Sequence, residues 1–244
     1  MQEFKSWLEY LGFEHAVKRR SRYVREAEGD DFLKAVLASA GKRVKTLPAG
    51  GFVWRAQLGH DMEPVFQDGE HIDNRPIPYP PDRMKPLRDR AKEGRANPRG
   101  IPCLYVATSR DTALAEVRPW IGSLISVAQF RIRRELRVVN CTTHGKASYV
   151  YVGAEPSPEA REEALWSDVD RAFAKPATPG DDVADYAPTQ IIAELFKVHG
   201  FDGIAYASSL GPGHNIALFD LDAADLVSRS LFRVKDVKFD FTTS

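Results

Sequence analysis

Cysteine is scarce in this chain of 244 residues, where only Cys103 and Cys141 are present. Two cysteines are too few for a disulfide framework, which favours a protein of the reducing cytoplasm. No apolar run reaches the length of a membrane span, and the N-terminus lacks the apolar core and cleavage site of a secretory signal. The sequence therefore predicts a cytoplasmic protein with no membrane partner.

Net charge is also lacking, because 34 basic and 34 acidic residues cancel. Bulk charge thus does not attract the chain to nucleic acid, and no direct nucleic-acid partner is expected. Basic residues do gather locally, with seven between Arg83 and Arg99 and four arginines between Arg131 and Arg137. Since Arg131 and Arg133 would share one face of an alternating strand, a solvated strand face is the favoured interpretation, and a nucleic-acid-binding or RNA-cleaving protein is the rival.

Several common motifs are missing. The chain has neither G-x-G-x-x-G after a strand nor a Walker-type phosphate loop, and it has no G-x-S-x-G nucleophile elbow. Six histidines and two cysteines form no C-x-x-C and no H-E-x-x-H, so no metal site is predicted. Cys103 adjoins an apolar strand, where a lone cysteine is more often a core residue than a nucleophile.

A helical segment opens the chain. The break at Leu47-Pro48-Ala49-Gly50-Gly51 separates it from the remaining residues. We therefore expect a helical N-terminal extension over residues 1–47, packed on a main domain over residues 48–244. The apolar residues with helical spacing form two faces, one with Phe4, Leu8 and Leu11, the other with Phe32, Val36 and Ala40.

Strand signals outnumber helix signals in the main domain. Residues 59–93 are proline-rich and polar, which predicts a long functional or mobile loop. Without strict βαβ alternation, the pattern predicts an α+β fold with a mainly antiparallel sheet and flanking helices, in which 125–132 and 136–139 are neighbours. Strands are expected at 52–56, 125–132, 136–139, 203–207 and 215–220, and helices at 157–175, ending before Pro176, and at 189–200.

The stretch GRANPRGIPCLYVATSRDTALAEVRP, residues 94–119, places many polar groups around a short apolar strand. Thr108 and Asp111 predict a capping box that starts a two-turn helix carrying Glu116. If Leu104 and Val106 face the core, Tyr105 faces the other side. The loop before the strand offers guanidinium groups and backbone amides suited to phosphates, and together these groups suggest a nucleotide pocket.

The order and spacing of these motifs resemble the RES-domain family, named for Arg, Glu and Ser. The pattern G-R-x-N-P-x-G-x-P-x-L-Y followed by A-L-A-E is matched from Gly94 to Glu116, and Trp54-Arg55 is similar to the family's earlier aromatic–Arg pair. The later blocks are Tyr186 to Gln190, then Gly200 to Ser209 and Asn215 to Phe219. The family Ser is Ser208 or Ser209, and Ser208 fits the pattern G-I-x-Y-x-S.

The resemblance implies a fold like that of ADP-ribosyltransferases and an enzyme that consumes NAD as a substrate rather than a cofactor. It implies a glycohydrolase or phosphorylase, many relatives of which are toxins inhibited by a helix-turn-helix antitoxin. The residues that match carry the expected roles, with Glu116, Arg95 and Ser208 as catalytic residues and Arg55, Tyr105, Asn97 and Asn215 as substrate-binding residues.

The same pocket residues are compatible with other classes of function. An ADP-ribosyltransferase would pass the sugar to a macromolecule instead of water or phosphate, and the residues do not reveal which acceptor is used. A degenerate, non-catalytic binding module is disfavoured because Arg55, Arg95, Tyr105, Glu116 and a serine are all present.

Overall fold

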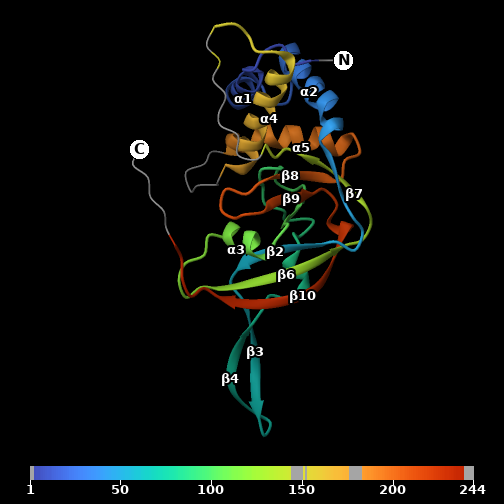
Figure 1. The fold of residues 1–244 in the computed structure, drawn as a ribbon. Helices are drawn as coiled ribbons and strands as arrows, with labels where there is room; N and C mark the ends of the chain where they lie inside the picture. The colour runs from blue at the N-terminus through green and yellow to red at the C-terminus, as the bar shows by residue number, and fades with distance from the viewer. Residues whose placement is uncertain (1–2, 144–150, 152, 176–182, 239–244) are drawn as a thin grey trace.

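The computed structural model describes residues 3–143, 151, 153–175 and 183–238. It has an α+β architecture in which a layer of helices lies on one face of a large curved sheet, and a narrow hairpin projects from the opposite end (Figure 1). No helix in the described ranges is long and apolar enough to cross a membrane. The predicted fold class, mainly antiparallel sheet with flanking helices, is confirmed.

The main sheet has eight strands in the order β1-β7-β8-β9-β5-β2-β6-β10. Among the strands of the described residues, only β7 and β8 pair in parallel, because the helices α4 and α5 connect them; the other pairs of this sheet are antiparallel. The strands are β1 (Val44–Leu47), β2 (Phe52–Leu58), β5 (Leu104–Ala107), β6 (Leu124–Ile132), β7 (Leu136–Asn140), β8 (Gly203–Ala207), β9 (His214–Leu218) and β10 (Ala224–Arg233).

The sheet has a weak seam between β5 and β2. These strands share a single register pair, Trp54 with Ala107, whereas β2 and β6 pair along seven positions. The two strands therefore splay apart beside that pair, which leaves side-chain space between the two halves of the sheet. This seam is where the candidate site lies.

The predicted pairing of 125–132 with 136–139 is wrong. β6 pairs with β2 and β10, and β7 pairs with β1 and β8. The link between β6 and β7 does not fold back as a hairpin, because the amide of Arg133 donates to the carbonyl of Ala223 and the chain runs on to pair Leu136 with Leu47. The chain thus passes directly from one half of the sheet to the other.

Helices α1 (Glu9–Arg19), α2 (Ala27–Ala40), α4 (Pro158–Ala174) and α5 (Ala187–Val198) form the helical layer. Ser157 caps α4 by accepting from the amide of Ala160, as predicted, and α4 ends at Ala174; Pro176 lies outside the described residues. Gly200 follows α5 with a φ of 79°, a left-handed conformation that suits glycine at a helix end.

Of the two apolar faces predicted for the N-terminal helices, one is confirmed and the other is wrong. Phe32, Val36 and Ala40 are buried as expected. The other face is wrong, because α1 begins only at Glu9 and buries Tyr10, Phe13 and Val17, leaving Leu8 and Leu11 about half exposed; Phe4 is buried. Residues 44–47, the last of the predicted extension, form β1 at the edge of the sheet.

Two apolar cores lie on the two faces of the sheet. One joins the helical layer to the sheet and includes Phe32, Trp166 and Phe196; the other lies beneath the sheet and includes Leu104 and Phe130. Leu104 and Val106 point into the lower core while Tyr105 packs against the upper one, as the strand alternation predicts. Ile192 and Phe196 are fully buried, but Leu195 is only partly buried.

The region 59–93 is not the loop that its prolines suggest. It contains an antiparallel hairpin of β3 (Asp61–Gln67) and β4 (Glu70–Ile77), which form a two-stranded sheet and pair with no other strand of the described chain. The turn residues Asp68 and Gly69 have φ values of 52° and 86°, which fits a two-residue hairpin turn. The Asp-Gly pair is thus the local signal that outweighs the surrounding prolines. Strand β10, near the C-terminus, also had no counterpart in the predicted elements.

Candidate active site

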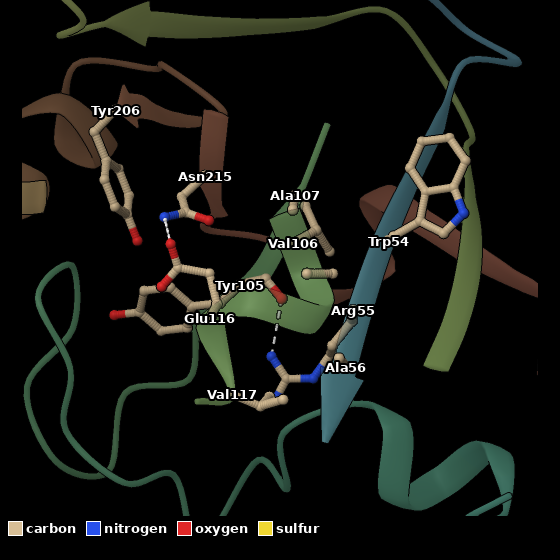
Figure 2. Close-up of a pocket in the computed structure, with 11 residues that line it drawn as sticks. Trp54, Arg55, Ala56, Tyr105, Val106, Ala107, Glu116, Val117, Tyr206 and Asn215 are labelled. Carbon is tan, nitrogen blue, oxygen red and sulfur yellow. Dashed lines mark hydrogen bonds between the residues drawn. The ribbon is translucent and has the colours of Figure 1, made fainter. Parts of the chain in front are cut away.

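A cavity of about 250 Å³ opens at the seam between β5 and β2. Its lining comes from five elements, namely β2, β5, β8, β9 and the short helix α3 (Arg110–Glu116). Figure 2 shows the polar side chains that meet there, which are Arg55, Tyr105, Glu116, Tyr206 and Asn215. Residues from distant parts of the chain therefore share one small pocket, as expected of a binding or catalytic site.

Helix α3 presents Glu116 to the cavity as its last residue. The helix starts at Ser109, whose hydroxyl accepts from the amide of Thr112 at 3.1 Å. The prediction of a cap at Thr108 is therefore wrong by one residue, since Thr108 instead accepts from the amide of His214 on β9. Ala113, three residues earlier on the same face of α3, is buried and also lines the cavity, so Glu116 lies on the cavity side of the helix.

One oxygen of the Glu116 carboxylate accepts two side-chain hydrogen bonds. The Ser208 hydroxyl and the Asn215 Nδ2 group each donate to Oε1 over 2.6 Å. Figure 2 shows the bond from Asn215 as a dashed line. Oε2 has no hydrogen-bond partner among the described residues, so the carboxylate is held by one oxygen and offers the other to the cavity.

The loop 208–213 fits tightly against α3. The Ser208 hydroxyl accepts from the amides of Leu210 and Gly211, and the hydroxyl of Thr112 accepts from the amide of Gly213. A Cβ on Gly211 would lie 2.9 Å from the Thr112 Cα, and one on Gly213 would lie 2.6 Å from the Thr112 Oγ1. Both glycines permit this close approach, which places Ser208 on Glu116.

The two candidate serines differ clearly in position. Ser209 turns away from the pocket, and its hydroxyl donates to the carbonyl of Ala174 at the end of α4. Of the pair, Ser208 contacts Glu116.

Arg55 spans the seam. Its Nη1 donates to the carbonyl of Tyr105 on β5 over 2.9 Å, also shown in Figure 2. Its Nε is buried without a hydrogen-bond partner in the described part of the chain. Burial lowers the pKa of the Arg55 guanidinium from its usual value, yet an arginine stays charged at neutral pH. The site therefore holds a partly buried cation whose donors are not all satisfied.

Tyr105 is fixed at its outer end. Its hydroxyl donates to Asn97 Oδ1 over 2.7 Å and accepts from the amide of Ala96. Burial raises the pKa of this phenol well above its usual value. Gly94 has no side chain to obstruct the contact, since a Cβ there would lie 2.5 Å from the Tyr105 hydroxyl. The ring thus lines the cavity while its hydroxyl belongs to the 94–97 loop.

Asn97 and Arg95 lie outside the lining of this cavity. The Asn97 amide donates to the carbonyls of Lys92, Pro98 and Ile101, and Gln190 binds the loop through the carbonyls of Gly94 and Asn97. Arg95 is buried, and its guanidinium lies 4.6 Å from the centre of the Tyr186 ring. The structure thus brings Arg55, Tyr105, Glu116, Ser208 and Asn215 together and places Asn97 and Arg95 behind them.

Tyr206 and Trp54 line the cavity although neither was among the predicted site residues. Figure 2 shows the Tyr206 hydroxyl directed toward Glu116 and Asn215. Burial, followed by the nearby Glu116 charge, raises the pKa of Tyr206 above its usual value. Both residues lie in the motifs that carry the family resemblance. The sequence therefore contained a signal for them, but no chemical reason distinguished them from their neighbours.

The two cysteines and the arginines of residues 131–137 have structural roles outside the cavity. Cys103 and Cys141 are buried, and burial raises the pKa of Cys103 to about 12, so its thiol stays protonated. Arg133 and Arg134 form ion pairs with Asp225 and Asp202, respectively, which supports the interpretation of these arginines as a solvated strand face.

The cavity combines a fixed carboxylate, a cation and tyrosine rings. This arrangement suits a ligand that has anionic groups and a centre where positive charge develops.

Comparison with known proteins gives a family and a distant structural likeness. Residues 71–242 match the protein-family model described as RES domain. Among solved structures, the crystal structure of the M. tuberculosis MbcT-MbcA toxin-antitoxin complex aligns with a TM-score of 0.45 and 15% identity, covering 81% of this chain and 92% of that chain. A search of curated proteins found no match.

Proposed function

Because the chain belongs to the RES-domain family, we propose that it binds NAD at the seam cavity and cleaves the bond between nicotinamide and ribose. The observation that carries the proposal is the Glu116 carboxylate, which Ser208 and Asn215 hold through Oε1 at the cavity wall. A carboxylate held in this way can stabilise the positive charge that develops on a ribose as its glycosidic bond breaks.

The reaction needs no redox partner. Water attacks C1′ of the nicotinamide ribose, the C1′–N bond breaks with its electron pair going to the pyridinium ring, and neutral nicotinamide leaves. The water loses a proton to solvent, and ADP-ribose remains. With phosphate as the acceptor, the same bond breaks and a ribosyl phosphate forms instead.

The residues around Glu116 would divide the remaining work. Arg55 would hold an oxygen of the pyrophosphate with donors that its bond to Tyr105 leaves over. Tyr105 and Tyr206 would stack against the flat groups of the ligand or bind ribose hydroxyls. Ser208 and Asn215 would hold the carboxylate in position through Oε1. Arg95, outside the lining and 4.6 Å from the centre of the Tyr186 ring, would act on the pyrophosphate or hold that ring.

The direct test is incubation of the purified chain with NAD alone and with added phosphate, followed by chromatography for free nicotinamide. We expect release in at least one condition. Labelled NAD added with cell extract separates the alternative, an ADP-ribosyltransferase, because the label would then stay on macromolecules. Absence of nicotinamide release under every acceptor condition would contradict the proposal.

We also propose that the protein is the toxin of a toxin-antitoxin pair, as the family resemblance implies, with a helix-turn-helix antitoxin as inhibitor. Expression of the chain alone should arrest growth as cellular NAD falls. Co-expression of a helix-turn-helix protein encoded beside it should restore growth. Normal growth with undiminished NAD would exclude this role while leaving the enzymatic proposal to its own test.

A further inference from the structure

The hairpin β3–β4, residues 61–77, is here named the arm, and it extends beyond the rest of the molecule (Figure 1). Its base is firmly held. The amide of Tyr79 donates to the Ser126 hydroxyl over 2.9 Å, and Arg229 donates to the carbonyl of Tyr79 over 2.6 Å. The arm therefore leaves the body in a defined direction, while its own two strands contact little else. A lone two-stranded hairpin is marginally stable in water, so such an arm gains stability from a partner.

The arm has two unlike faces. Strand alternation places Met62 and Phe66 on one face, where they are 50% and 61% exposed. The ring contact between Phe66 and His71 agrees with this register. The opposite face carries the carboxylates of Glu63, Asp73 and others, with Glu63 paired to Arg75. The arm thus has an apolar face and, on its other side, an acidic face, and the acidic face is the one suited to a charged partner.

The edges of the arm are less suited to binding than its faces. Pro64 stands in β3 and Pro76 in β4, and proline lacks the amide hydrogen that an added strand would need. A partner of the arm is therefore expected to meet its side chains instead of extending its sheet.

A second surface of the same chain has a charge opposite to that of the arm. The arm has five carboxylates and one arginine, net −4. Residues 85–99, here named the basic segment, have six basic and two acidic residues; Arg95 is buried, and the other charged side chains sum to +3. The basic segment also has an exposed apolar residue, Leu87, at 54%. Within the described residues, no ion pair joins the two; Arg88 instead pairs with Asp222. Arg90, Lys92 and Arg99 are exposed.

We propose that the arm of one copy of this chain docks on the basic segment of a second copy, and that the reciprocal contact forms a two-fold dimer. Opposite charge on two surfaces of one chain, with no ion pair between them in the described residues, favours a second copy as the partner, because each copy supplies both halves of the contact. The inference does not depend on the proposed chemistry.

Sedimentation equilibrium of the full chain should give twice the chain mass. Raising the salt from about 0.1 M to about 1 M, which shortens the screening length from about 10 Å to about 3 Å, should weaken the dimer. A monomer at the highest attainable concentration in low salt would overturn the proposal, including the case in which the arm binds a different protein.

Charge exchange gives the sharper test. One variant carries Asp61→Lys, Glu70→Lys and Asp73→Lys in the arm, and the other carries Arg90→Glu, Lys92→Glu and Arg99→Glu in the basic segment. Each should be monomeric with unchanged circular dichroism and nicotinamide release, and a mixture of the two should form a one-to-one heterodimer. Dimers that persist in either variant, or a mixture that stays monomeric, would overturn the proposed contact.

Discussion

The Ser208 hydroxyl donates to Glu116 Oε1 over 2.6 Å across 92 residues of sequence. The contact joins the last residue of α3 to the loop after β8. Asn215 on β9 donates to the same oxygen. Three elements therefore hold one carboxylate, so its position depends on contacts that single substitutions can remove.

Glu116→Gln should lower kcat for nicotinamide release by about 10²–10³ while KM changes little, because the charge acts chiefly in the transition state. Glutamine retains an oxygen that can accept from Ser208 and Asn215, so the fold should persist. Steady-state kinetics with a thermal melt checks both points. Glu135→Gln, at an exposed site outside the cavity, is the matched control. A Glu116→Gln protein as active as its parent would remove Glu116 from the chemistry.

Ser208→Ala should lower kcat by about 10–100-fold, the effect of losing a hydrogen bond to a charged group worth about 1.5–3 kcal/mol. Ser209→Ala should leave the kinetics unchanged, because its hydroxyl binds only the carbonyl of Ala174 among the described residues. Parallel measurement of kcat and KM for the two variants checks this. Equal losses of kcat in the two variants would show that activity depends on the conformation of the loop rather than on the Ser208 hydroxyl.

Arg55→Lys should raise the KM for NAD by about tenfold, since lysine keeps the charge but cannot both bind the Tyr105 carbonyl and reach a phosphate with a planar fork. Arg131→Lys, exposed on β6, is the control and should behave as wild type. Binding of ADP-ribose by calorimetry gives a second measure. An unchanged affinity would exclude Arg55 from the phosphate site.

Gly211→Ala should destabilise the fold by about 1–3 kcal/mol, because its Cβ would lie 2.9 Å from the Thr112 Cα. Displacement of the loop should also reduce kcat. Gly12→Ala in α1 meets open space and should instead stabilise the protein by about 0.5–1 kcal/mol. Denaturant melts of both variants test the contrast, and a Gly211→Ala protein as stable as wild type would argue against the tight loop.

Asp202 should contribute to stability in a pH-dependent way. Burial favours its neutral form, but hydrogen bonds from Arg134 and from the amide of Arg137 lower its pKa below the usual value. A lowered folded-state pKa gives stability that is present above about pH 4 and is lost as the pH falls through the folded-state pKa. Asp202→Asn should thus lose about 1–2 kcal/mol at pH 7 and less in acid. Asp89→Asn, highly exposed, should show neither effect in melts across pH.

Local patterns determined much of the fold in advance. The Ser157 cap, the spacing of Ile192 and Phe196, and the alternation of Leu104, Tyr105 and Val106 along β5 each reflect burial or hydrogen bonding within a few residues, so the sequence shows them directly. The wrong prediction for residues 59–93 arose where two local signals competed. Prolines around the arm suggested a loop, but the Asp68-Gly69 turn and cross-strand pairing prevailed.

For the candidate site, too, some features follow from local sequence and others only from the tertiary structure. By itself, the sequence determined the family, the fold class and the residue types that fill the motifs, because motif spacing and periodicity are properties of neighbouring residues. Only the tertiary structure decided that β5 and β2 part beside Trp54 and Ala107, that Ser208 rather than Ser209 reaches Glu116, and that Asn97 serves the loop behind the pocket. Strand order and side-chain contacts depend on which distant surfaces pack together, and that free energy belongs to the whole chain rather than to any segment of it.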